Sequence, residues 1–494
     1  MNPESPATPP APPVPAPADT VCRLSATELA RRTRGDELSA VEVVSAHLDR
    51  LRALDPAINS VCTLDEEGAM RRARTLDDTT RGDWAPPLLG VPLLVCDLHN
   101  VEGLPTTRGS SLFAGVAAPD SDLHVERLLQ AGAVVLGKTN VPELGIGAHT
   151  HNRLYGETRN PHDPNHTAGG ASGASAAAVV SGFAPLADGV DLGGSLRAAA
   201  AFCGAVALTP SLGRVPSALR NDAWQTLSHV GPVARSAEDA ALLLAVMSGP
   251  DPRSPFSIAG LDVAVAPDLD SDPGSWRAAH LATTGELAPE APIAEPFEGC
   301  VGRLAEAGVA VAEESLDLGG AGDVFKILDT WRLSTRNAEL LRRRRDDLDK
   351  NLAWQIEQGL QLNGLVLAQA QAARTRLLRR LLKALETYDV LLLPTTRVPP
   401  FAVRSPWARE LDTVRDTRLQ VLGLTGLLSM LGLPVATVPC GVTAEGLPVG
   451  LQVVGPPRED LRVLRFARLV EQVGGFDAGP VAPRRRRRGR GAQG

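Results

Sequence analysis

The stretch from residue 168 to residue 204 reads "AGGASGASAAAVVSGFAPLADGVDLGGSLRAAAAFCG" and holds two glycine-rich segments, 168–178 and 191–197. Glycine lets the backbone enter tight turns that other residues avoid. Each glycine-rich turn is followed by small residues, which allow a helix to pack closely behind it. Ser195 follows Gly193 and Gly194 at the start of the second small-residue run, a position where nucleophilic serines are often found.

Outside this stretch, patterns typical of helices and strands alternate along the chain. Residues 25–54 carry apolar residues at helical spacing, with Ser25 and Glu28 placed as in a capping box. Residues 122–140 read as a helix, a glycine and a strand. Short apolar runs predict further buried strands at 87–96, 389–396 and 433–440. The alternation predicts an α/β fold, a mixed sheet covered by helices on both faces.

Composition excludes several classes of protein. The chain has 494 residues, of which 44% are hydrophobic, and this is ample for a large core. A formal net charge of −7 argues against nucleic acid as the main partner. There is no run of 18 apolar residues and no signal-peptide pattern, so we expect a cytoplasmic protein that does not enter a membrane. The six cysteines form no C-x-x-C pair, which predicts neither disulfides nor a zinc site.

The chain is expected to form one domain between two unfolded ends. We predict a disordered Pro-rich leader at 1–20, a folded domain at 21–478 and a disordered Arg-rich tail at 479–494. The tail could touch nucleic acid or acidic lipid, but a solvated tail is the better interpretation. Residues from about 320 to 386 are almost continuously helical, which indicates a helical insertion that lines a pocket, or alternatively a plain packing layer.

The glycine-rich segments favour acyl chemistry over nucleotide binding. Neither segment has the lysine of a phosphate loop, and the G-x-G-x-x-G spacing is absent. No metal-ligand spacing occurs, so neither a cofactor nor a metal is expected. The backbone N–H groups of Leu192, Gly193, Gly194 and Ser195 can converge on one oxyanion. The same pattern also occurs in tight turns that have no catalytic role.

Residues 169–216 closely resemble the core of the amidase signature family. The family pattern is close to G-G-S-S-G-G-S-A-A-A, then G-T-D-x-G-G-S-I-R-x-P-A-x-x-x-G. Other segments follow in the family's order, namely "GVPLLVCDLHNVEGLPTTRGS", "AGAVVLGKTNVPELG", "YGETRNPHDP", "YDVLLLPTT" and "LGLPVATVPCGVTAEGLPVGLQVVG". The resemblance covers roughly residues 21–475 and implies one large α/β domain, a mixed twisted sheet surrounded by helices.

The resemblance also implies a catalytic triad, in which a neutral lysine deprotonates the nucleophilic serine through a bridging serine. The nucleophile position falls on Ser195, the bridging-serine position on Ala171, and the lysine position, in a stretch resembling G-V-P-x-x-x-K-D, on Cys96. Ala171 has no hydroxyl, and Cys96 is short and mostly a neutral thiol at its ordinary pKa. We therefore expect conventional amide hydrolysis to be nearly abolished.

The surroundings of this triad are partly retained. Residues that match the family pattern are Ser172, Asp191, Gly193, Gly194 and Arg197. Residues that depart from it are Ala174, Val190, Ala199 and Thr209. Changes that gather around one site while the scaffold persists indicate relaxed or redirected selection on the chemistry.

Other residues are candidates for a substitute base. His99 lies three residues after Cys96, and His149 and His151 lie just upstream of the first glycine-rich segment. Histidine titrates in the range that a general base needs. Cys96 itself, paired with His99, is an alternative nucleophile, although a buried cysteine at a strand end is more often inert. Lys138 belongs to a framework segment of the family, so it is not expected to replace the lost lysine.

Three functions remain open. The first is a repurposed amidase fold that carries out a non-hydrolytic reaction, such as a cyclisation or rearrangement, on an amide- or carbonyl-bearing metabolite of a bacterial biosynthetic pathway. The second is an active amidohydrolase that uses Ser195 with a substitute base. The third is a non-catalytic pseudoenzyme or binding subunit. An amidotransferase component of the tRNA-dependent type is disfavoured because it needs the triad. A homodimer is compatible with the sequence, which does not specify the oligomeric state.

Overall fold

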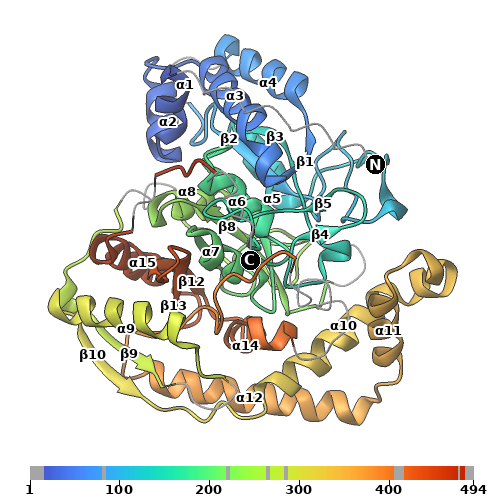
Figure 1. The fold of residues 1–494 in the computed structure, drawn as a ribbon, viewed down its shortest axis with the longest axis vertical. Coiled ribbons are helices and arrows are strands. Elements are labelled where there is room, and N and C mark those ends of the chain that lie inside the picture. The colour runs from blue at the N-terminus through green and yellow to red at the C-terminus, as the bar shows by residue number, and fades with distance from the viewer. Residues whose placement is uncertain are drawn as a thin grey trace, which may run out of the picture.

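A computed structural model describes residues 16–79, 85–217, 223–262, 268–282, 287–404, 417–476 and 479–483. Its centre is an eleven-stranded sheet with helices on both sides (Figure 1). The strand order is β1-β3-β2-β6-β8-β7-β12-β13-β11-β9-β10. Strand β2 is parallel to β3 and β6, whereas β8 is antiparallel to both of its neighbours, β6 and β7, so the sheet is mixed as predicted.

The strands of the large sheet are β1 (Val61–Leu64), β2 (Pro92–Cys96), β3 (Val134–Thr139), β6 (Leu186–Leu192), β7 (Val206–Thr209), β8 (Ser228–Ala234), β9 (Arg277–Leu281), β10 (Ala310–Glu314), β11 (Val390–Pro394), β12 (Val435–Val442) and β13 (Pro448–Val454). A separate hairpin consists of β4 (His151–Asn152) and β5 (Gly156–Glu157).

The α-helices are α1 (Ala16–Arg23), α2 (Ala26–Arg34), α3 (Ala40–Ile58), α4 (Glu66–Thr79), α5 (Leu123–Gln130), α6 (Gly173–Val180), α7 (Ser195–Cys203), α8 (Ala237–Met247), α9 (Ala291–Glu306), α10 (Ala321–Arg344), α11 (Lys350–Leu360), α12 (Gly364–Leu385), α14 (Thr417–Ser429) and α15 (Asp460–Gly474). Short 3₁₀ turns occur at Ser111–Phe113, Glu143–Gly145, Pro273–Ser275 and Arg345–Asp347.

The apolar runs in the sequence form the strands and helices that were predicted for them. The three predicted strands are β2, β11 and β12, and residues 122–140 form α5 and β3. The Ser25 side chain caps α2 by accepting from the Glu28 N–H at 3.0 Å. The Glu28 carboxylate instead pairs with Arg31 and Arg32, and the complete reciprocal capping box lies at the start of α3.

Alternation along the strands separates two cores. In β2, Leu93 and Val95 join the core that includes α5, α8 and α15, whereas Leu94 joins the core of α3, α6 and α7. In β6, Leu186 and Ala187 divide in the same way. Because successive side chains of a strand point to opposite faces, Asp188 lies on the α5 face of β6. This places Asp188 away from the face that α6 and α7 cover.

The region from 320 to 386 contains α10, α11 and α12, which extend along one side of the molecule (Figure 1). Phe325 and Leu328 of α10 pack with Leu381 of α12 and with Leu424 of α14. Of the two predicted disordered ends, residues 16–20 belong to α1, and residues 1–15 and 484–494 lie outside the described residues.

The structure also describes the cysteines and the longest helices. All six cysteines are free. Among the described residues, no helix combines the length and the apolar composition that crossing a membrane requires.

A buried carboxylate between α15 and α8 predicts a pH-dependent stability. Glu471 accepts a hydrogen bond from the Ala237 N–H at 2.8 Å, and burial raises its pKa from 4.5 to about 7. Because the pKa of Glu471 is higher in the folded state than in the unfolded state, its contribution to stability is fully present below the unfolded-state pKa. That contribution is lost as the pH rises through the folded-state pKa. Glu471→Gln is therefore expected to be more stable than wild type by about 3 kcal/mol at about pH 8 and equal at about pH 4, in urea unfolding. Equal stabilities at both pH values would contradict this.

Candidate active site

Ser195 is the first residue of α7 and follows a turn that only glycines can form. Gly193 and Gly194 have φ values of +69° and +92°, in the left-handed region. A Cβ added to Gly194 would lie 1.9 Å from Thr425 Cβ, and one added to Gly193 would lie 2.5 Å from Phe325 Cζ. The two glycines therefore satisfy both the backbone conformation and the close approach of α14 and α10.

The Ser195 hydroxyl is held by the backbone of β6. Its Oγ donates to the Val190 carbonyl oxygen at 2.8 Å and accepts from the Leu192 N–H at 3.3 Å. The side chain is buried. Within the part of the chain that the structure describes, no histidine, lysine or cysteine side chain forms a hydrogen bond with this hydroxyl.

The turn supplies fewer free donors than the sequence predicted. The Leu192 N–H is used by Ser195, and the Gly194 N–H donates to Asp191 Oδ1 at 2.9 Å. Among the described residues, the N–H groups of Gly193 and Ser195 have no hydrogen-bond partner. Two of the four predicted donors are thus available to polarise a ligand carbonyl.

Asp191 and Arg197 form a buried ion pair that fixes this turn. Arg197 Nε donates to Asp191 Oδ2 at 3.0 Å, and Ser429 and Thr209 donate to the same carboxylate. Burial alone would raise the pKa of Asp191, but the Arg197 guanidinium outweighs it and lowers the pKa to about 2. Asp191 therefore remains ionised at neutral pH, and it positions the Gly194 N–H rather than the Ser195 hydroxyl.

The first glycine-rich segment lies directly against Ser195. A Cβ added to Gly170 would lie 3.2 Å from Ser195 Cβ. The next residue, Ala171, is buried and contributes only a methyl group. Ser172 is occupied, because its Oγ donates to the Val190 carbonyl at 3.1 Å and accepts from the Val190 N–H at 2.9 Å. Ser172 thus supports β6, and neither side chain offers a free hydroxyl to Ser195.

Cys96 ends β2 and is fully buried. Its backbone N–H donates to Asp188 Oδ1 at 2.6 Å. Burial, followed by the negative charge of Asp188, raises the pKa of the Cys96 thiol well above its ordinary value. The thiol is therefore protonated at neutral pH, which makes it a poor nucleophile and a poor base.

Two cavities adjoin this centre. One, of about 640 Å³, lies between the loop at 142–153 and helices α10 and α11. The other, of about 530 Å³, is lined by Val190 and Leu192 of β6 and by His99 and His124. Ile146 lines both cavities. The two cavities thus meet at Ile146, and the second reaches the end of β6 that precedes the Gly193–Gly194 turn.

Comparison with known proteins identifies the family. The family described as Amidase matches residues 42–464, which is most of the chain. This chain belongs to the amidase family. An acylamidase of Rhodococcus erythropolis is 34% identical over 91% of this chain and 95% of its own length. A glutamyl-tRNA(Gln) amidotransferase component from Streptomyces avermitilis is 32% identical over 91% of this chain and 95% of its own length.

Solved structures of the amidase family have the same fold. A bacterial aryl acylamidase of the amidase signature family superimposes with a TM-score of 0.84 at 26% identity, covering 92% of this chain and 97% of that one. A 6-aminohexanoate cyclic dimer hydrolase complexed with substrate gives a TM-score of 0.82 at 28% identity, covering 94% and 100%. The α/β fold expected from the resemblance is thereby confirmed.

Lys138, the nearest lysine in sequence to the site of this amidase-family chain, is fully occupied elsewhere. Its Nζ donates to Asp97 Oδ1 at 3.2 Å, to the Pro105 carbonyl at 3.3 Å and to Thr106 Oγ1 at 3.2 Å. All three ammonium protons thus have acceptors. Lys138 serves the loop that follows β2 and makes no hydrogen bond to Ser195.

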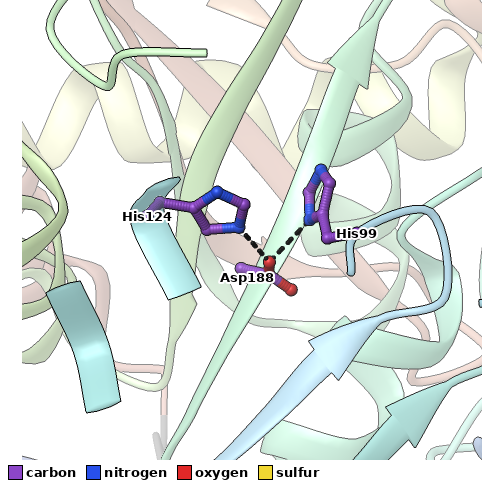
Figure 2. A group of neighbouring side chains, drawn as sticks. All are labelled: His99, His124 and Asp188. Atoms are coloured by element: carbon purple, nitrogen blue, oxygen red, sulfur yellow. Dashed lines mark hydrogen bonds and ion pairs between the residues drawn. The ribbon is translucent and has the colours of Figure 1, made fainter. Parts of the chain in front are cut away.

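His99, a candidate base, is bound to Asp188 rather than to Ser195 (Figure 2). Its Nδ1 lies 2.6 Å from Asp188 Oδ2, and His124 Nε2 lies 2.8 Å from the same oxygen. Burial opposes a charge on His99, but Asp188 outweighs it and raises the pKa of His99. His124 was not singled out from the sequence. The available signals were a histidine on the buried face of α5 and two aspartates, Asp188 and Asp191, inside a strand whose other residues are apolar or glycine.

The other two candidate histidines lie at the 640 Å³ cavity. His149 Nδ1 lies 2.7 Å from Thr167 Oγ1, and His149 Nε2 is buried and has no hydrogen-bond partner among the described residues. Burial, together with the neighbouring His151, lowers the pKa of His149 to about 3. The His151 side chain is exposed and stacks on His149, with ring centroids 6.2 Å apart. His149 is therefore neutral at physiological pH.

Proposed function

We propose that this protein binds an amide- or carbonyl-bearing small molecule and catalyses a non-hydrolytic reaction on it. The serine relay by which the family hydrolyses amides is not used. The observation that carries the proposal is the hydrogen bond from the Ser195 hydroxyl to the Val190 carbonyl oxygen, 2.8 Å away. A backbone carbonyl holds a proton without removing it. The hydroxyl therefore has no partner that could make it an alkoxide.

The proposal assigns the family's bridging serine to Ala171 and its lysine to Cys96. Ala171 cannot relay a proton, and the Cys96 thiol keeps its own proton because its pKa is raised. In subtilisin, a different serine hydrolase, loss of the nucleophile or the base lowers turnover by about 10⁶. A loss of that order leaves the oxyanion donors and the binding cavities as the useful parts of the site.

The remaining donors suit a substrate that carries its own nucleophile. The N–H groups of Gly193 and Ser195 would polarise a carbonyl, which favours attack by an amine or hydroxyl of the same molecule. The new C–N or C–O bond is internal to the substrate, the bond between the carbonyl carbon and its original substituent breaks, and that substituent leaves with the proton of the attacking group. No enzyme acyl intermediate is needed. Such a cyclisation or rearrangement, placed in a biosynthetic pathway, is the reaction class that we propose.

A fluorophosphonate probe and the chromogenic amide 4-nitroacetanilide test this proposal. We expect no labelling of wild type above the Ser195→Ala background, and no release of 4-nitroaniline above the protein-free rate. Retention of an intact carbonyl ligand, detected by native mass spectrometry of the purified protein, is the positive result expected. Labelling of wild type that disappears in Ser195→Ala would overturn the proposal.

A second candidate function, hydrolysis by Ser195 with a substitute base, is favoured by one observation. His149 is neutral and lies at the edge of the 640 Å³ cavity, and within the part of the chain that the structure describes its Nε2 has no hydrogen-bond partner. This candidate requires labelling of wild type that is lost in Ser195→Ala and strongly reduced in His149→Gln. Exposed His151 provides the matched control, because His151→Gln should leave the labelling unchanged.

A further inference from the structure

Three buried side chains from three elements meet at one point (Figure 2). His99 comes from the turn after β2, His124 from α5 and Asp188 from β6. One nitrogen of each imidazole and a carboxylate oxygen of Asp188 lie within 4.8 Å of one another. The imidazole rings are nearly perpendicular, at 79°, with centroids 4.5 Å apart. Both rings thus direct a nitrogen to the same side of the carboxylate.

The charge of Asp188 has no fixed counter-ion. Its side chain is fully buried, and among the described residues its ion-pair partners are only His99 and His124. With both imidazoles neutral, the cluster would hold an uncompensated negative charge in the interior, which is costly. Either a proton or a bound cation must balance it.

We propose that His99, His124 and Asp188 bind one divalent transition-metal ion, with Zn²⁺ as the reference ion. Two imidazole nitrogens and one carboxylate oxygen are the protein ligands of many zinc sites that keep a coordination position open. Ligands about 2.0–2.2 Å from an ion lie about 3.3 Å from one another, so the two nitrogens move several tenths of an ångström away from Asp188 Oδ2 on binding.

Two features of the surroundings fit a metal ligand set. The Cys96 N–H holds Asp188 Oδ1 at 2.6 Å, which leaves Oδ2 directed at the two histidines. Such a hydrogen bond from outside the ligand set fixes the orientation of a ligating carboxylate. His99 and His124 also line the 530 Å³ cavity, so an ion has a route of entry from that space.

This site is separate from the Ser195 hydroxyl, because Asp188 lies on the α5 face of β6. A metal ion here would be a Lewis acid that polarises the oxygen of a ligand in the 530 Å³ cavity. The inference does not depend on the proposed function, since ion binding is measured without turnover and without reaction at Ser195.

Metal titration of the full chain tests the inference. Protein stripped with a chelator should bind one Zn²⁺ per chain in calorimetry, and Co²⁺ should give the visible absorption of a low-coordinate nitrogen–oxygen site. Zn²⁺ should also raise the melting temperature, because binding to the folded state stabilises it. Failure of wild type to bind one ion per chain would overturn the proposal, whatever the variants do.

Variants locate the ion. His124→Gln and Asp188→Asn should each weaken Zn²⁺ binding by about 100-fold or more and abolish the Co²⁺ spectrum, with folding checked by circular dichroism. His149→Gln is the matched control, since His149 is an equally buried histidine outside the cluster, and it should bind like wild type. Unchanged affinity in folded His124→Gln and Asp188→Asn would place the ion elsewhere and refute the assignment.

Discussion

The double variant Cys96→Lys/Ala171→Ser is expected to react with a fluorophosphonate at Ser195 at least about 10³-fold faster than wild type. The gain is smaller than the roughly 10⁶ lost in subtilisin when its base is removed, because a grafted base is less well oriented than an evolved one. The Gly193–Gly194 turn and the two free N–H donors are already in place. Ser195→Ala in the double-variant background is the control for labelling elsewhere.

A third substitution sharpens this experiment. The negative charge of Asp188 raises the pKa of the Cys96 thiol, and it would likewise hold a lysine at that position in the protonated form. Adding Asp188→Asn should therefore speed labelling further, by about 10-fold, in chelator-treated protein, because a larger fraction of the lysine is then neutral. If neither the double nor the triple variant reacts faster than wild type, the missing relay is not what keeps Ser195 inert.

Arg197→Met is expected to lower the free energy of unfolding by about 3–5 kcal/mol, because removing one partner of a buried ion pair leaves the other charge uncompensated. Arg197 is fully buried and donates to Asp191, Gln452, Thr425 and Ser429. Urea unfolding followed by circular dichroism measures the loss.

Two variants make the Arg197 measurement specific. Arg342→Met breaks an exposed ion pair with Glu339 and should leave the urea midpoint close to that of wild type. Asp191→Asn added to Arg197→Met removes the stranded charge and should recover part of the loss. A cost for Arg197→Met no larger than that for Arg342→Met would show that the buried pair does not hold the turn.

The sequence by itself determined much of this protein. Apolar runs bounded by glycine and proline predicted β2, β11 and β12, because a buried strand needs a short run of apolar residues that is visible in the local sequence. The glycines before Ser195 predicted its turn, since a positive φ is a local requirement. The family resemblance directed attention to Ala171 and Cys96. Both residues are buried, and among the described residues neither side chain forms a hydrogen bond with Ser195.

Only the tertiary structure decided how the polar groups pair. In the structure, His99 and His124 both contact Asp188. No local sequence pattern connects these three residues, which are far apart in the chain. Two of the four predicted oxyanion donors are also occupied, because the Leu192 N–H donates a hydrogen bond to Ser195 and the Gly194 N–H donates one to Asp191. The physical reason is that a hydrogen bond or a ligand set depends on distances across the fold, whereas a helix or a strand depends on the order of neighbouring residues.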